Sequence, residues 1–89
     1  MEQIMRPVDV ISVCSAEGEI RPLRLQLEGK DSKMIRMDIL EVIGVEEISY
    51  IGIESHVFLC RARAEGKETL LELKYSLRDH CWRLLRRLC

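Results

Sequence analysis

The sequence has no run of apolar residues near the length of about 18 that a membrane-spanning helix requires. Its first residues, Met-Glu-Gln-Ile-Met-Arg-Pro, lack the basic stretch and the apolar stretch of a signal peptide. Proline and glycine are sparse, at two and five of 89 residues, so no segment has the composition of a disordered tail or linker. We therefore expect residues 1–89 to form a single folded domain in the cytoplasm, with no membrane partner.

Motifs of catalysis and nucleotide binding are also missing. The sequence contains no Gly-x-Ser-x-Gly elbow, no phosphate-binding Walker loop and no Gly-x-Gly-x-x-Gly segment. The carboxylates of Glu41, Glu46 and Glu47 have no evident acid–base partner, and we expect them on the solvated face of a turn. The sequence therefore predicts no enzymatic activity and no cofactor.

The cysteines include no Cys-x-x-Cys pair, and without an export signal we expect free thiols rather than disulfides. The four are Cys14, Cys60, Cys81 and Cys89. In a strand, His56 and Cys60 would lie about 13 Å apart, and the adjacent His80 and Cys81 would point to opposite faces. We therefore predict no metal site. A nucleophilic pair, Cys60 with His80 or Cys14 with His56, would require a fold that brings the two side chains together.

Acidic and basic residues balance overall but not along the chain. The net charge is −1, from 14 basic and 15 acidic residues. Residues 1–60 carry six Lys or Arg and eleven Asp or Glu, whereas residues 61–89 carry eight and four. The near-neutral total argues against a dedicated nucleic-acid binder, and the asymmetry favours a surface that steers a charged partner.

Regular punctuation by glycines and polar clusters predicts an all-β fold. Runs of about 7–12 residues separate these clusters, the spacing typical of a small barrel or sandwich. The turn signals fall at residues 15–19, 29–33, 52–55, 65–68 and 78–80. Leu23, Leu25 and Leu27 alternate with polar residues, as in a strand with one buried face. The two alternating runs on either side of Glu65–Glu68 predict a hairpin.

Irregularities in the pattern carry further predictions. The alternation of Ile35, Met37 and Ile39 changes phase at Leu40, which predicts a β-bulge near Ile39–Glu41. The run Val8–Cys14 is apolar on both faces and predicts a central strand. Pro22 near the start of the next run is tolerated at an edge or a bulge.

Residues 77–89 fit two structures. Leu77, Cys81 and Leu84 recur at helical spacing, but Trp82 and Leu84 also alternate around Arg83. We favour a closing strand over Cys81–Arg86, with a short C-terminal helix as the alternative. The fold predicted is a five- or six-stranded antiparallel meander closed into a small barrel of SH3 or OB size. Its predicted core contains Val10, Leu23, Leu25, Leu27, Ile35, Met37, Ile39, Phe58, Cys60, Leu71, Leu73, Tyr75 and Trp82.

An arginine-rich C-terminal part is the candidate interaction surface. Its members are Arg61, Arg63, Arg78, Arg83, Arg86 and Arg87. Trp82 lies among them, and Trp and Arg are both enriched in protein interfaces. We predict a non-enzymatic interaction module that binds a protein partner or a second copy of itself, for which an unpaired edge strand is one route. The alternative is single-stranded nucleic-acid binding through this arginine-rich region, with Tyr75 and Trp82 as stacking platforms.

The order of features resembles that of a group of small bacterial all-β proteins containing a domain of unknown function, some encoded beside lesion-bypass DNA polymerases. The residues that carry the resemblance are Pro7-Val8-Asp9-Val10, Arg21-Pro22-Leu23-Arg24-Leu25, Gly29, Ile39–Val42 and Trp82-Arg83-Leu84. Leu25-Gln26-Leu27 stand where that group has an aromatic-rich strand. The resemblance implies a small bacterial barrel and assigns no activity to any residue.

Overall fold

The computed structural model describes residues 2–29 and 31–88, and the side chains of residues 5–29 and 31–88. These residues form seven strands and no helix. The strands are β1 (Glu2–Pro7), β2 (Asp9–Cys14), β3 (Ile20–Glu28), β4 (Met34–Tyr50), β5 (Ile53–Ala64), β6 (Lys67–Ser76) and β7 (Cys81–Arg87).

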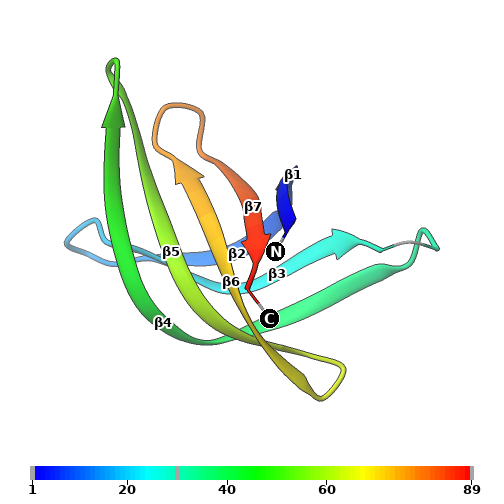
Figure 1. The fold of residues 1–89 in the computed structure, drawn as a ribbon. Coiled ribbons are helices and arrows are strands. Elements are labelled where there is room, and N and C mark those ends of the chain that lie inside the picture. The colour runs from blue at the N-terminus through cyan, green and yellow to red at the C-terminus, as the bar shows by residue number, and fades with distance from the viewer. Residues whose placement is uncertain (1, 30, 89) are drawn as a thin grey trace.

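All seven strands join one antiparallel sheet in the order β1-β7-β6-β5-β4-β3-β2. Strands β2 to β7 pair consecutively, as a meander does, and β1 adds to the outer side of β7. The sheet curls into a half-barrel (Figure 1). The all-β prediction is confirmed, but the predicted five or six strands and the closed barrel are wrong.

The two edge strands of the open sheet belong to one stretch of chain. Only Val8 separates β1 from β2, and its N–H donates to the carbonyl of Trp82 at 3.2 Å. The chain therefore runs along β7, turns at Val8 and continues along β3. The two edges meet at Val8 but form no ladder with each other in the described part of the chain.

Two-residue turns connect the long hairpins. Glu65 and Gly66 both have positive φ angles, 52° and 76°, and Ala64 pairs with Lys67. This is the geometry that matches the twist of a hairpin, and it confirms the predicted one. Ile51 and Gly52 form a second such turn, with φ of 50° and 76°. Strand β4 therefore reaches Tyr50, and the turn at Ile51–Gly52 shares only Gly52 with the one predicted over residues 52–55. Glu46 and Glu47 lie within β4, so their predicted turn position is wrong.

Bulges bend β3 and β4 at three leucine or isoleucine residues. The β4–β5 register shifts at Leu40, as predicted, and again at Ile43, which was not predicted. The β2–β3 register shifts at Leu23, next to Pro22, which confirms the bulge interpretation of that proline. A bulge adds one residue to one strand and increases its bend. In Figure 1, β4 turns sharply and then rises with β5 away from β3.

Two further sequence interpretations have clear outcomes. Val8–Cys14 is not a central strand: β2 is an edge strand that pairs only with β3, so Ile11 on its outer face remains 59% exposed. The C-terminal strand is confirmed as Cys81–Arg87, and the helical alternative is wrong. The register explains this outcome, because β7 pairs with β6 on one side and with β1 on the other.

The core lies on the concave inner face. Its buried members are Leu25, Leu27, Met37, Phe58, Cys60, Ala62, Leu71, Leu73, Tyr75, Trp82 and Leu84. Trp82 packs between Phe58 and Tyr75, with ring centroids 5.4 and 4.9 Å away. Leu23 was predicted in the core but is 41% exposed, because its bulge turns it out of the alternation. Val10, Ile35 and Ile39 are partly buried and pack against the core.

Candidate functional site

The predicted arginine surface is largely neutralised on β5 and β6. Glu68 on β6 accepts hydrogen bonds from Arg61 at 2.9 Å and from Arg63 at 3.1 Å. Arg61 also donates to Glu41 of β4 at 3.3 Å. The hydrogen bonds from Arg61 and then Arg63 lower the pKa of Glu68, because they favour its charged form. This part of the outer face is thus a cross-strand ion-pair network rather than a basic patch.

The remaining candidates do not gather into one unpaired cluster. Arg86 on β7 pairs with Glu72 of β6, which raises the pKa of the Arg86 guanidinium. Asp79 has a lowered pKa, mainly through a hydrogen bond from Ser76 and with a smaller contribution from the charge of Arg83. Arg78 and Arg87 make no ion pair with the described residues. Three of the six predicted arginines are therefore engaged in direct ion pairs.

The aromatic rings proposed as stacking platforms are buried. Trp82 is 8% and Tyr75 7% exposed, and both form part of the core. Tyr50 is 70% exposed, but it lies at the tip of the β4–β5 hairpin, outside the arginine-rich strands. A nucleic-acid base would therefore find neither indole nor phenol face open beside these arginines.

The side chains of Cys60 and His80 form hydrogen bonds with different partners and not with each other. The Cys60 thiol donates to the Phe58 carbonyl, and burial raises the pKa of Cys60 to about 12. Nδ1 of His80 instead shares a hydrogen bond of 2.8 Å with the Tyr75 hydroxyl. Within the described residues, no three His, Cys, Asp or Glu side chains are grouped so that they could hold a metal ion.

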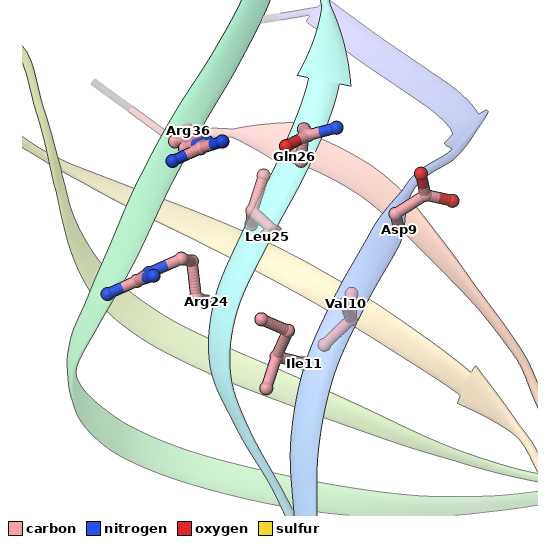
Figure 2. A pocket seen from close by; sticks show the side chains of 7 residues that line it. All are labelled: Asp9, Val10, Ile11, Arg24, Leu25, Gln26 and Arg36. Atoms are coloured by element: carbon pink, nitrogen blue, oxygen red, sulfur yellow. The ribbon is translucent and has the colours of Figure 1, made fainter.

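A shallow pocket of about 280 Å³ lies across β2, β3 and β4. Figure 2 shows the guanidinium groups of Arg24 and Arg36 on the β4 side and the carboxylate of Asp9 on the β2 side. Arg24 is held by Asp38 at 2.8 Å. The pocket therefore offers mixed charge on an open surface, without a nucleophile or a paired acid and base.

Strand β4 presents an open edge along its second half. Residues Met34–Asp38 pair with β3, and residues from Asp38 to Tyr50 pair with β5. Beyond Asp38 the described strands supply no second neighbour for β4, so one row of its backbone N–H and C=O groups is unpaired. The bulges at Leu40 and Ile43 produce this edge, because they carry β4 away from β3.

The space between residues 20–23 of β3 and residues 39–45 of β4 forms a groove, which we call the fork. On its inner side it has a volume of about 370 Å³, and on its outer side about 260 Å³. Its inner wall is mostly apolar, and Glu19 and Arg21 lie at its rim. The apolar lining residues are Val13, Ile20, Val42, Val45 and Phe58.

Exposed apolar side chains continue from the fork to the tip of the hairpin. Val45 is 53% exposed, and Ile51 at the turn is 83% exposed. The other large apolar side chains exposed on this hairpin are Leu40, Ile43, Ile48, Tyr50 and Ile53. Contiguous exposed apolar surface of this kind marks interaction sites in monomeric proteins. The fork and the open edge of β4 are thus the candidate functional site.

The sequence contained one signal for this site, the phase change at Leu40, but not its consequence. A bulge can be predicted from alternation, whereas the loss of the β3 neighbour depends on how two hairpins diverge in space. Comparison with protein-family models, with curated proteins and with solved structures gives no match. The resemblance to small bacterial barrel proteins stays a prediction. No helix of the described residues is long and apolar enough to span a membrane.

Proposed function

We propose that this protein is a non-enzymatic interaction module that binds a protein partner by adding a strand to the open edge of β4. The observation that carries the proposal is the pairing of β4: residues Met34–Asp38 pair with β3, whereas from Ile39 to Tyr50 the strand pairs with β5 alone. An extended segment of a partner would pair with the free N–H and C=O groups and place alternate side chains in the fork.

The exposed apolar side chains of β4 also favour a partner strand that covers this edge. Long edge strands with apolar side chains tend to associate, and proteins usually shield them with charge, proline, a short length or a covering element. Residues 40–50 contain no proline and no lysine and carry charge only as three glutamates, and five of the eleven are isoleucine, valine or leucine. A partner strand would cover this surface and satisfy the backbone at the same time.

Single-stranded nucleic-acid binding through the arginine-rich strands has less support. Arg61, Arg63 and Arg86 already pair with carboxylates, so a phosphate would have to displace Glu68 or Glu72. The buried rings of Tyr75 and Trp82 would have to leave the core before a base could stack on them.

The proposal can be tested by capture from an extract of the source organism. The bait is the purified protein, and the edge variant is Val45→Asp, which places a charge in the fork. The matched control is Ile11→Asp, which adds the same charge at an equally exposed apolar residue on the outer face of β2. Captured proteins are identified and then recombined as purified components.

We expect a partner that binds the unaltered protein and Ile11→Asp but not Val45→Asp, together with protection of β4 amides from hydrogen exchange in the purified complex. The proposal fails if a recombined partner binds all three proteins equally, or if its binding protects no amide in residues 40–50.

A further inference from the structure

We infer that the strand recognised by the fork is a segment of a basic partner protein in which Lys or Arg alternates with apolar side chains. This inference rests on the proposed function and names the chemistry of the partner. Its basis is the distribution of charge around the open edge, combined with the direction in which successive β4 side chains point.

The charge around the open edge is almost entirely negative. Residues 40–55 contain four glutamates and no Lys or Arg. The facing β2–β3 turn adds Glu17 and Glu19, and Arg21 is the single cation that lines the fork. The four glutamates are Glu41, Glu46, Glu47 and Glu54.

Little of this charge is compensated locally. Glu41 pairs with Arg61. Glu47 lies 3.9 Å from Nε2 of His56, which is an ion pair only when that histidine is protonated, and its side chain is 84% exposed. Glu46 and Glu54 make no ion pair with the described residues. A basic segment would thus meet carboxylates that need not be freed from existing partners.

Over residues 41–46 the register separates the apolar and acidic contacts onto two faces. Val42 lies opposite Cys60, and Val45 lies opposite Phe58, so both valines face inward toward the core side of the sheet. Glu41 lies opposite the outward-facing Arg61, and Glu46 follows Val45 and points the other way. A strand added along residues 41–46 would meet valines on its inner face and glutamates on its outer face, and Glu47, opposite His56, adds a carboxylate on the inner side beyond Val45. Alternation of apolar and basic side chains satisfies both.

A second copy of this chain is a poorer occupant of the same edge. Pairing of two β4 edges would bring together two segments that each carry Glu41, Glu46 and Glu47 without a basic residue. Like charges across adjacent strands destabilise their pairing. Charge complementarity therefore favours a basic partner, and self-association through β4 is an outcome that the experiment can detect.

The experiment uses three synthetic peptides of about eight residues, a typical strand length. Each alternates valine with one polar residue: lysine, threonine or glutamate. Binding is measured by fluorescence anisotropy, and the binding site by amide hydrogen exchange of the full-length protein. We expect the lysine peptide to bind at least about tenfold more tightly than the threonine peptide at low salt, and the glutamate peptide to bind most weakly. Raising the salt from about 0.05 to about 0.5 M should reduce the difference.

Two matched double variants locate the charge effect. Glu46→Gln with Glu47→Gln should weaken the lysine peptide severalfold and leave the threonine peptide unchanged. Asp31→Asn with Glu65→Gln removes the same charge at two other turns, where both residues are exposed, and should leave both peptides unchanged. Methylation of the peptide nitrogens that face β4 should abolish binding, because it removes the donors that strand addition needs.

Each contrary result has one meaning. If the threonine or glutamate peptide binds as tightly as the lysine peptide and protects residues 40–50, the basic partner is wrong and strand addition stands. If light scattering finds a dimer whose β4 amides are protected, the second copy is the occupant and the inference is overturned. If no peptide binds, the inference fails, and the Val45→Asp capture test separately decides the proposed function.

Discussion

Val45 lies directly opposite Phe58 in the β4–β5 ladder, yet Val45 is 53% exposed and Phe58 only 2%. Directly opposed residues share a face of the sheet, so both point to the concave side. The difference marks the edge of the core. Strand β5 has β6 as its second neighbour, and Phe58 packs against Trp82 of β7. The adjoining part of β4 has no neighbour on its far side among the described strands.

This boundary predicts unequal costs for two neighbouring truncations. Phe58→Ala should lower the free energy of unfolding by about 3–5 kcal/mol, because it leaves a cavity beside Trp82. Val45→Ala should cost less than about 1 kcal/mol, because the side chain is already half in water. Urea denaturation of both variants checks the comparison. Equal losses would mean that the inner face of β4 is covered.

The Glu68 network predicts a specific sensitivity to acid. The hydrogen bonds from Arg61 and Arg63 lower the pKa of Glu68 below its ordinary value of 4.5, so its ionised form is bound more favourably in the folded protein. The resulting stability is present above pH 4.5 and is lost as the pH falls through the lowered pKa. In urea denaturation measured over a range of pH, the midpoint of Glu68→Gln should therefore fall less steeply at acid pH than that of the unaltered protein.

The control for that experiment is Glu65→Gln at the adjacent turn, which removes a carboxylate that makes no ion pair with the described residues. Its pH profile should follow that of the unaltered protein. An unchanged profile for Glu68→Gln would show that the two arginines do not hold this carboxylate in solution.

The cysteines should differ sharply in reactivity. Cys14 and Cys81 are exposed, whereas Cys60 is buried and its pKa of about 12 keeps the thiol protonated at neutral pH. An aromatic disulfide reagent should label Cys14 and Cys81 in the native protein and Cys60 only after unfolding. Peptide mapping of the labelled protein reads out each site. Rapid native labelling of Cys60 would contradict the packing described for β5.

Two glycines should respond in opposite directions to the same substitution. Gly66 has a φ of 76°, a conformation that costs an L residue about 1–2 kcal/mol, so Gly66→Ala should destabilise the β5–β6 hairpin by that amount. Gly44 lies within β4, and a Cβ added at this position would meet no heavy atom within 4 Å. Gly44→Ala should therefore be neutral or stabilising by up to about 1 kcal/mol. Thermal unfolding compares the two, and equal losses of stability would contradict the backbone geometry of the Gly66 turn.

Much of the sheet could be predicted from alternation alone. The hairpin at Gly66, the strand around Leu25 and the bulge at Leu40 follow from local patterns, because each depends on which side chains share a face. Strand β1 could not be predicted this way. Residues Glu2–Pro7 show no clear alternation, and they are held as a strand by pairing with β7.

The candidate site could not be predicted from the sequence for a different reason. Val45 looks like a core residue in a strand pattern, and its exposure follows from the loss of the β3 neighbour beyond Asp38. The arginine-rich C-terminal part shows the converse limit of the sequence. Its charge is visible in the sequence, but the carboxylates that neutralise it lie on adjacent strands.

The open edge of β4 is tested most directly by amide hydrogen exchange in the isolated monomer. Residues Ser55–Arg63 of β5 have neighbours on both sides, and residues from Leu40 to Tyr50 of β4 only on the β5 side. The amides of a strand point alternately to its two sides, so about every second amide in the second half of β4 should exchange rapidly, while those of Ser55–Arg63 in β5 are protected in unbroken sequence. Uniform protection from Leu40 to Tyr50 in the monomer would contradict the open edge and the binding function built on it.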